Sequence, residues 1–247
     1  MSTLAGRRAL VTGGSRGIGQ AIAVRLAAAG ADVAIGFRER ERDALDTVSR
    51  IEALGRRALA IRCDVSVRED VRAMVAAAVE ALGGIDTLVN SAGQLQQKPF
   101  RELTDDDWDR TLAVNLKGTF LCCQESEASL RLQPRGAVVN LASSGGQLGG
   151  PLAVHYSASK AGVISLTRSL ARILAPDITV NCISPGLIDT DMTRAEIASD
   201  GGQEKIRAIP AERPGTADEV AQAAVFLAGA AYITGHTLNV NGGIYLG

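Results

Sequence analysis

The segment RALVTGGSRGIG, residues 8–19, decides how this sequence folds. Residues 8–12 form an apolar run typical of a buried strand, and the segment at 18–29 is typical of a helix. Glycines at positions 13, 14, 17 and 19 lie between them. Glycine permits a tight turn and a close approach of the backbone to an anion, and a helix amino terminus adds amide donors. An ordinary strand-to-helix turn is the alternative, but this position in a first strand–helix unit favours a dinucleotide phosphate loop, although the spacing is G-x-x-x-G-x-G rather than G-x-G-x-x-G.

The rest of the chain repeats the alternation of short apolar runs and longer amphipathic segments. Strands are expected at residues 8–12, 32–37, 58–63, 85–90, 137–142, 178–183 and 237–240. Helices are expected at residues 18–29, 40–54, 67–82, 105–130, 154–175 and 217–228. Continuous apolar strands separated by helices indicate a parallel sheet covered on both faces. The predicted fold is therefore α/β, a doubly wound parallel sheet of about seven strands in one domain spanning residues 1–247.

Two stretches, residues 94–103 and 187–213, do not fit this alternation. Long irregular connections in a compact α/β domain are usually functional loops. We expect both at the carboxyl ends of strands, where such sheets bind ligands, and we expect the second to be a substrate loop.

Composition excludes several classes of function. The 26 Lys and Arg balance 27 Asp and Glu, and no basic block suggests nucleic-acid binding. Two His and four Cys without CxxC or HExxH spacing argue against a metal site, and the cysteines are expected to be buried in a reducing compartment. Residues 1–6 lack the pattern of a secretory signal, and residues 220–234 are too short and too interrupted by glycine to span a membrane. We therefore expect a cytoplasmic protein that binds neither a membrane nor a nucleic acid.

The end of the second expected strand bears on the choice of coenzyme. NAD-binding domains place a carboxylate there for the ribose 2′-hydroxyl, but this strand ends in Phe37-Arg38. Arg38 and Arg16 are suited to a 2′-phosphate, because guanidinium groups bind phosphate well. The alternative is that either arginine is a solvated surface charge, but the missing carboxylate favours NADP(H).

Candidate catalytic residues gather around one helix. Tyr156 and Lys160 stand four residues apart and so share a helix face. Ser143 lies thirteen residues before the tyrosine at the end of a strand, and Asn115 lies within the preceding long helix. A Tyr-x-x-x-Lys pair alone is equally consistent with a surface pair. Of the three tyrosines, however, only Tyr156 has a lysine one helical turn onward.

These residues give the sequence a resemblance to the short-chain dehydrogenase/reductase family over nearly its whole length. The segments that carry it are Thr12-Gly13-x-x-x-Gly17-x-Gly19, Asp64-Val65, Asn90-Ser91-Ala92-Gly93, Asn115, Ser143, Tyr156-x-x-x-Lys160 and Pro185-Gly186 leading to Thr190. The family usually has Asn-Asn-Ala-Gly where this chain has Asn90-Ser91-Ala92-Gly93, which puts only local turn hydrogen bonds in doubt. The resemblance implies a Rossmann-type sheet, an NADP-dependent enzyme acting on CH–OH groups, and a homotetramer assembled partly through helices 105–130 and 154–175.

The resemblance also implies a role for each site residue. Tyr156 would donate the proton, Lys160 would lower the pKa of the phenol and hold the nicotinamide ribose, Ser143 would orient the substrate oxygen, and Asn115 would hold a water. Asp64 and Val65 would border the adenine, Asn90 to Gly93 the adjoining ribose, and Ile188 with Thr190 the carboxamide. The complete set of implied cofactor-binding residues is Gly13, Ser15, Arg16, Gly17, Ile18, Gly19, Arg38, Asp64, Val65, Asn90, Ala92, Gly93, Tyr156, Lys160, Pro185, Gly186, Ile188 and Thr190.

Within the family, the sequence is most similar to 3-oxoacyl-[acyl-carrier-protein] reductases of fatty acid biosynthesis, through segments 114–120, 188–193 and 240–245. An acidic carrier would require basic residues beside the site entrance. Arg131 and Arg135 precede the fifth strand, but Asp177 precedes the sixth. A free small ketone, sugar or alcohol is therefore an alternative substrate. A non-catalytic cofactor sensor is a remote alternative, because all four catalytic residues are present.

Two further features have competing interpretations. Asp105, Asp106 and Asp107 follow Thr104 and indicate a helix cap rather than a metal site. His155 precedes the candidate tyrosine, and the sequence leaves open whether it contacts a substrate or points elsewhere from the helix.

Overall fold

The computed structural model describes residues 4–247; residues 1–3, part of the amino-terminal stretch considered for a secretory signal, lie outside the described residues. Seven parallel strands form one sheet in the order β3-β2-β1-β4-β5-β6-β9. Their bounds are β1 Arg8–Thr12, β2 Asp32–Phe37, β3 Ala58–Arg62, β4 Thr87–Asn90, β5 Gly136–Leu141, β6 Ile178–Pro185 and β9 Thr237–Val240. All seven expected strands are confirmed, with ends that differ by at most two residues.

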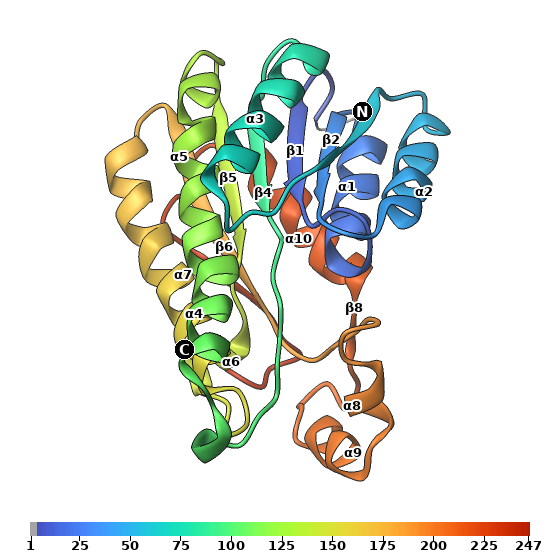
Figure 1. The fold of residues 1–247 in the computed structure, drawn as a ribbon. Helices are drawn as coiled ribbons and strands as arrows, with labels where there is room; N and C mark the ends of the chain where they lie inside the picture. Colours follow the sequence, from blue (N-terminus) through green and yellow to red (C-terminus); the bar gives the residue numbers. More distant parts are fainter. Residues whose placement is uncertain (1–3) are drawn as a thin grey trace.

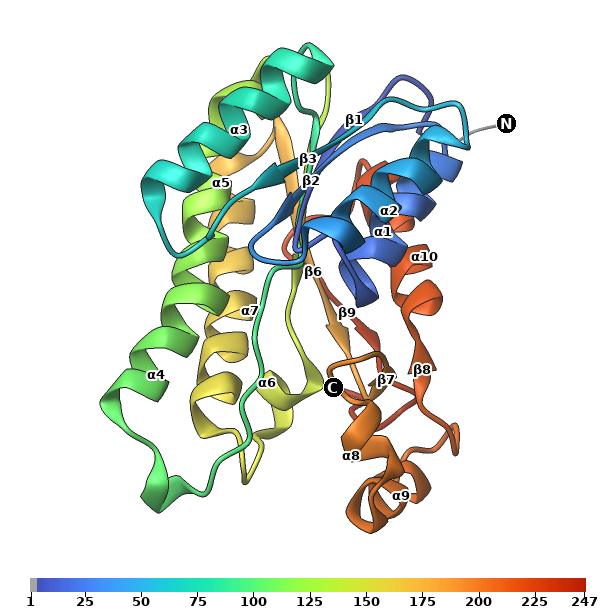
Figure 2. The ribbon, with the colours of Figure 1, turned by 45° about the vertical axis from the view of Figure 1, so that its right-hand side comes forward.

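Helices cover both faces of the sheet (Figures 1 and 2). On one face lie α1 Gly17–Ala28, α2 Glu41–Glu52 and α10 Ala217–Gly229, and on the other lie α3 Arg68–Leu82, α5 Gly118–Arg131 and α7 Val154–Leu174. Each layer has its own apolar core: Ile22 and Leu227 belong to the first, and Met74, Leu121 and Leu174 to the second. Since both faces are buried, the central strands are apolar along their length rather than alternating.

The strand order reverses at β1, whose two neighbours in the sheet are β2 and β4. Such a reversal leaves a crevice outside the carboxyl ends of the strands, and ligands of open α/β sheets bind there. The glycine-rich segment follows β1 and residues 91–99 follow β4, so both begin at this crevice. Figure 2 shows α6 Ser144–Leu148 and α8 Arg194–Ala198 at the same edge of the sheet.

The expected single helix over residues 105–130 is wrong in one respect. The structure has α4 Asp105–Leu112, a π-helical turn η2 Ala113–Lys117, and then α5. π turns inside helices occur frequently at functional sites, and this one contains Asn115.

The stretch 187–213 was expected to be irregular but contains regular structure. Strand β7 Ile188–Asp189 pairs with β8 Gly215–Thr216, and two short helices, α8 and α9 Asp200–Arg207, lie between them. The stretch 94–103 is irregular as expected, apart from the 3-10 turn η1 Phe100–Glu102. The helices α8 and α9 are too short to give a clear 3.6-residue pattern, which explains why periodicity did not reveal them.

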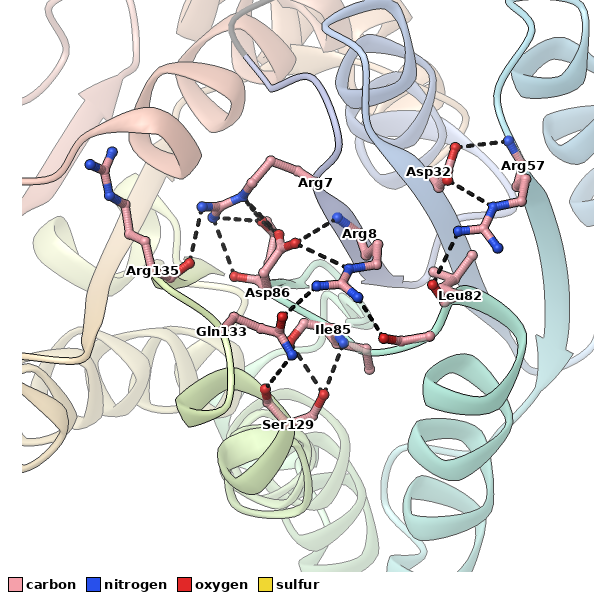
Figure 3. Close-up of polar contacts among 12 residues, drawn as sticks. Arg7, Arg8, Asp32, Arg57, Leu82, Ile85, Asp86, Ser129, Gln133 and Arg135 are labelled. Carbon is pink, nitrogen blue, oxygen red and sulfur yellow. Dashed lines mark hydrogen bonds and ion pairs between the residues drawn. The ribbon is translucent and has the colours of Figure 1, made fainter.

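The amino-terminal edge of the sheet, opposite the crevice, is held by arginines bound to two buried carboxylates, Asp86 and Asp32 (Figure 3). Asp86 is 4% exposed; it lies 2.7 Å from Arg7 Nε and accepts a hydrogen bond from the backbone N–H of Arg8. The Asp32 carboxylate accepts hydrogen bonds from the backbone N–H and from the side-chain Nε of Arg57. Asp86, before β4, thus connects to the start of β1, and Asp32, the first residue of β2, connects to Arg57, before β3. Within residues 4–247, no helix is long and apolar enough to cross a membrane.

Candidate active site

The glycine-rich segment joins β1 to α1 through three glycines that no other residue would replace without strain. Gly13 has φ +67°, and a Cβ there would lie 2.8 Å from Ala92 Cα. A Cβ on Gly19 would lie 2.2 Å from the Gly13 carbonyl oxygen, so the first turn of α1 packs directly on the loop. Gly17 has φ +56°, and a Cβ there would meet nothing closer than the methyl group of Thr190 at 3.7 Å. The loop therefore leaves room between α1 and Thr190, next to the free amides at the helix start.

Thr12 connects this loop to the segment after β4. Its hydroxyl accepts hydrogen bonds from the backbone N–H groups of Ser91 and Ala92, each at 3.1 Å. Asn90 points the other way: it is 3% exposed, and its side-chain amide donates to Asn140 Oδ1 and Cys123 Sγ in the core. The side-chain nitrogen of Asn90 is thus used within the core, and the backbone of residues 90–93 follows β4 into the crevice.

Arg38 is held between two carboxylates. Its guanidinium lies 2.7 Å from Glu39 and 3.9 Å from Asp64, and its side chain is 39% exposed. Asp64 is fixed in turn by hydrogen bonds from the backbone and hydroxyl of Ser66. Burial opposes ionisation of Asp64, but the Ser66 bonds and Arg38 outweigh it and lower its pKa. Arg16, the other candidate for a phosphate, lies 3.9 Å from Asp191.

Lys160 is 6% exposed, and its ammonium donates a 2.7 Å hydrogen bond to the carbonyl oxygen of Leu141. Burial lowers the pKa of this lysine to about 8. A Cβ on Gly93 would lie 3.5 Å from Lys160 Nζ and 3.3 Å from Asn115 Oδ1, so both groups are close to one point in the crevice. Only glycine at position 93 leaves that point free.

Asn115 is completely buried and uses both ends of its amide. Oδ1 accepts from the backbone N–H of Gln94, and Nδ2 donates to the Gln94 carbonyl and to Ser159 Oγ. Ser159 donates onward to the carbonyl of Tyr156 at 2.7 Å. Asn115 therefore ties the loop after β4 to the first turn of α7, which carries the candidate tyrosine.

Ser143 follows β5 and is the N-cap of α6, its hydroxyl oxygen accepting from the Gly145 N–H at 3.1 Å. Tyr156 lies in the first turn of α7 with Lys160 Nζ 5.8 Å from the centre of its ring. Position 145 faces both residues, because a Cβ there would lie 3.4 Å from Ser143 Oγ and 3.7 Å from Tyr156 Cε1. The predicted serine, tyrosine and lysine thus meet at the carboxyl edge of the sheet.

The expectation that Lys160 lowers the pKa of Tyr156 is not met. Burial raises the pKa of this phenol, and the hydrogen bond with Ser143 acts in the opposite direction without cancelling it. The physical reason is that Tyr156 is desolvated, whereas the lysine charge is turned to the Leu141 carbonyl.

Residues 185–190 form the other wall of the crevice. A Cβ on Gly186 would lie 2.8 Å from Asn241 Cα, so this glycine is required by the turn from β6. Ile188 is 3% exposed and lies in β7, within the core, while Thr190 faces Gly17. Of these two candidates for binding the carboxamide, Thr190 has its side chain at the crevice, whereas the side chain of Ile188 lies in the core.

His155 and the aspartates at 105–107 are not part of the site. His155 has no exposed surface, so it is unable to touch a substrate in this conformation, and neither ring nitrogen has a hydrogen-bond partner among residues 4–247. Asp107 and Thr104 form a capping box at the start of α4, as predicted. No group of three or more possible metal ligands occurs in residues 4–247, and the four cysteines are free and buried.

The basic residues expected beside the site entrance lie elsewhere. Arg131 and Arg135 precede β5, and Asp177 precedes β6, so all three are at the amino edge of the sheet, opposite Ser143. Arg131 binds Asp177 at 2.6 Å and Glu127 at 2.9 Å. They do not flank the site of their own chain, because the carboxyl edge of a parallel sheet is a full strand length away.

Sequence reasoning missed Gln94 and the contact between the two irregular stretches. Gln94 binds the Asn115 side chain through its backbone N–H and carbonyl. Any residue type has these backbone groups, so the sequence does not reveal this role. Gln97 Nε2 donates to Glu196 Oε2 at 3.0 Å and so connects the loop after β4 to α8 across the crevice. These two residues are 99 positions apart in the sequence, so no local sequence pattern predicts their contact.

Comparison with known proteins gives a family to this arrangement. The sequence family described as Enoyl-(Acyl carrier protein) reductase matches residues 13–245. The 3-oxoacyl-[acyl-carrier-protein] reductase FabG of Staphylococcus aureus (strain Mu50) is 40% identical over 243 residues, covering 97% of this chain and 98% of its own. This chain belongs to the short-chain dehydrogenase/reductase family.

Solved structures of the same family have the same fold. A short chain dehydrogenase from Burkholderia cenocepacia J2315, in complex with NADP, is 41% identical, with a TM-score of 0.93 over 98% of this chain and 99% of its own. A putative short-chain alcohol dehydrogenase from Sinorhizobium meliloti 1021 is 44% identical, also with a TM-score of 0.93, over 98% of this chain and 97% of its own. The protein is therefore an oxidoreductase of this family. The names of its relatives refer to different substrates.

Proposed function

We propose that this protein is an NADPH-dependent reductase that converts a ketone to a secondary alcohol, with a 3-oxoacyl thioester as its substrate. The observation that carries the proposal is the meeting of Ser143, Tyr156 and Lys160 at the carboxyl edge of the sheet, beside the glycine-rich loop. The FabG relatives, at 40% identity over nearly the whole chain, support the choice of substrate.

The crevice fits NADP(H) by its shape and by its charges. Gly13, Gly17 and Gly19 clear the space at the start of α1, and Gly93 clears the space beside Lys160. We propose that backbone amides of the glycine loop hold the pyrophosphate and that the side chains of Arg16 and Arg38 hold the 2′-phosphate. The full set of proposed cofactor contacts is Gly13, Ser15, Arg16, Gly17, Ile18, Gly19, Arg38, Asp64, Val65, Asn90, Ala92, Gly93, Tyr156, Lys160, Pro185, Gly186, Ile188 and Thr190.

The catalytic side chains handle the proton that the reaction needs. When bound, NADPH supplies the hydride for the carbonyl carbon. The Ser143 hydroxyl oxygen accepts from the Gly145 N–H, and its proton is donated to the substrate oxygen once that oxygen is in place. Tyr156 gives its phenolic proton to that oxygen, and Lys160 lies beside it with Nζ 5.8 Å from the centre of the ring. Within residues 4–247, one of the three N–H donors of Lys160 is used, by Leu141, and we assign the other two to a ribose hydroxyl and to a water beside Asn115.

A free small carbonyl compound is the second candidate substrate, and one observation favours it. Arg131 and Arg135, the basic residues considered for an acidic carrier, lie at the edge of the sheet opposite Ser143, and Arg131 is paired with Asp177 and Glu127. A side-by-side comparison decides between the candidates: reduction of a 3-oxoacyl chain on acyl-carrier protein, of acetoacetyl-coenzyme A and of small activated ketones, each with NADPH and NADH. The proposal expects the highest kcat/KM for a thioester with NADPH. A higher value for free ketones would replace the proposed substrate, and no reduction of any of them would refute the function.

We also propose that the protein is a homotetramer. Exposed apolar side chains on the helices expected at the interface support this: Trp108 is 39% exposed, Phe120 38% and Ile173 66%. Light scattering at micromolar concentration is expected to give four times the chain mass of 25.7 kDa, and a monomer mass would refute the assembly.

A further inference from the structure

The short helix α6 holds Ser143 at two atoms. The Ser143 hydroxyl oxygen accepts from the Gly145 N–H at 3.1 Å, and its carbonyl oxygen accepts from the Gly146 N–H at 2.9 Å. Any movement of α6 therefore moves the hydroxyl that is directed to the substrate oxygen.

Gly146 sets the distance between α6 and the catalytic helix α7. A Cβ at this position would lie 2.7 Å from the Ala161 nitrogen, 2.7 Å from the Lys160 carbonyl carbon and 2.9 Å from Lys160 Cβ. Two of these three atoms are backbone inside a helix of 21 residues, so they are unable to give way as the end of a flexible side chain would. The glycine thus brings the backbone of α6 against the catalytic lysine itself.

Gln147 fixes α6 on its other side. Its side-chain oxygen accepts from Ser184 Oγ at 2.6 Å, and its side-chain nitrogen donates to Asn239 Oδ1 at 3.0 Å. Ser184 belongs to β6 and is fully buried, and Asn239 belongs to β9. One glutamine therefore connects α6 to the carboxyl ends of two strands, while the glycine before it connects α6 to α7.

We propose that Gly146 and Gln147 are positioning residues that set the location of the Ser143 hydroxyl relative to Tyr156 and Lys160. In this role they act through the helix that Ser143 caps. The proposal rests on the proposed ketone reduction, in which this serine orients the substrate oxygen.

A methyl group on Gly146 has a predictable effect. Carbon atoms pack at about 3.5 Å or more, so a contact of 2.7 Å requires α6 and α7 to separate by close to 1 Å. A misplacement of this size at a catalytic group lowers rates by about 100-fold. Ser143 acts to lower the pKa of the Tyr156 phenol, so moving the serine hydroxyl away would raise that pKa.

The test compares Gly146→Ala with the matched control Gly229→Ala. Gly229 ends α10, and a Cβ there would lie 3.8 Å from its nearest neighbour, so this variant makes the same change to a helical residue without a clash. We expect Gly146→Ala to reduce acetoacetyl-coenzyme A with a kcat about 10- to 100-fold below wild type, with an NADPH Kd within about twofold of it. We expect no additional loss of kcat when Gly146→Ala is combined with Ser143→Ala, because both act on one hydroxyl. Gly229→Ala is expected to match wild type.

A second measurement needs no substrate. The protein is labelled with 3-fluorotyrosine, whose phenol titrates at lower pH than tyrosine, and the Tyr156 resonance is assigned by its loss in Tyr156→Phe. The pKa of this resonance is expected to rise in Gly146→Ala and in Ser143→Ala, and to stay at the wild-type value in Gly229→Ala. Should wild type reduce no carbonyl compound, the proposed function fails, while this titration still decides the positioning.

Gln147→Leu decides the matter if Gly146→Ala does not fold. It keeps the size of the side chain but removes both anchoring hydrogen bonds, and it is expected to lower kcat about 10-fold and to raise the pKa of the Tyr156 resonance. The proposal is overturned if a folded Gly146→Ala, or Gln147→Leu in its place, has the wild-type kcat and phenol titration, or if the losses from Gly146→Ala and Ser143→Ala multiply.

Discussion

At the scale of one residue, burial of the charged Lys160 lowers the free energy of unfolding, although the proposed reaction needs this residue. Its ammonium is buried with a single carbonyl partner, and burial lowers its pKa from 10.5 to about 8. A shift of this size corresponds to roughly 3 kcal/mol of unfavourable burial at pH 7. Between about pH 8 and 10.5 the folded protein has released this proton and the unfolded chain has not, so the penalty from Lys160 declines as pH rises through that window.

The variant Lys160→Met tests this reasoning. It is expected to abolish reduction but to raise the free energy of unfolding at pH 7 by about 1 to 3 kcal/mol, because a buried charge is replaced by an apolar chain. Urea unfolding at pH 7 and at pH 9.5, at one protein concentration, measures the difference from wild type. The difference should shrink at the higher pH, and an equal difference at both pH values would show that the lysine charge is not the cause.

Arg38 carries the coenzyme preference at the same scale. The variant Arg38→Asp places a carboxylate where a 2′-phosphate would lie, so kcat/KM with NADPH should fall at least 10-fold while that with NADH stays level or rises. Arg40→Asp is the control, since Arg40 is more exposed than Arg38 and pairs with Asp43 on its own helix. An unchanged NADPH-to-NADH ratio in Arg38→Asp would remove this residue from the site.

At the scale of elements, the two irregular stretches meet through one hydrogen bond. Gln97, after β4, donates to Glu196 of α8, and Glu196 also pairs with Lys205 of α9. The bond is exposed and so contributes only about 1 kcal/mol, but it spans the opening of the crevice. We infer that it limits how far the segment 187–213 moves from the site.

Replacing Gln97 by Leu should therefore raise KM for the carbonyl substrate about two- to fivefold with little change in kcat. Gln96→Leu is the matched control, because Gln96 donates to Asp107 on its own side of the crevice. Steady-state kinetics of both variants give the answer. Equal KM values in the two variants would mean that the Gln97–Glu196 contact has no part in substrate binding.

The elements also show what a sequence reveals and what it does not. Strand and helix periodicity predicted all seven strands of the sheet and its main helices, because each buries a continuous or amphipathic face. The π turn at residues 113–117 was not predicted, since Asn115 interrupts the helix through bonds to Gln94 and Ser159 that lie far away in the sequence. Helix α6 was missed because five residues with two glycines have no helical signature of their own.

The candidate site, like the fold, was predicted from the sequence only in part. Ser143, Tyr156 and Lys160 were predicted from their types and spacing, and the structure brings them together. The bond from the Asn90 side chain to Asn140 in the core was not predicted, because the direction of a side chain at a strand end depends on register rather than on residue type. The pKa of Tyr156 was assigned the wrong direction, because burial is a property of the folded chain.

At the scale of the whole molecule, function and stability occupy opposite edges of one sheet. The carboxyl edge carries the crevice, and the amino edge carries the charge network around Asp86 (Figure 3). Asp86→Asn keeps the size of the side chain but leaves Arg7 and Arg8 without their carboxylate. We expect a loss of about 2 to 3 kcal/mol in the free energy of unfolding and an unchanged kcat.

The control for this prediction is Asp43→Asn, which breaks an exposed pair with Arg40 and should cost less than about 0.5 kcal/mol. Urea unfolding and steady-state kinetics are run on both variants. A large fall in kcat for Asp86→Asn, at a temperature where the protein stays folded, would mean that the two edges are coupled.

The proposed function depends above all on Tyr156 as the proton donor of an NADPH-dependent ketone reduction. The most direct test measures oxidation of NADPH by acetoacetyl-coenzyme A with wild type and with Tyr156→Phe, together with the NADPH Kd of each. We predict clear turnover by wild type, a loss of at least 1,000-fold (about 4 kcal/mol) in kcat for Tyr156→Phe, and a Kd that changes by less than about threefold. Turnover by Tyr156→Phe within about tenfold of wild type would show that the proton comes from another group.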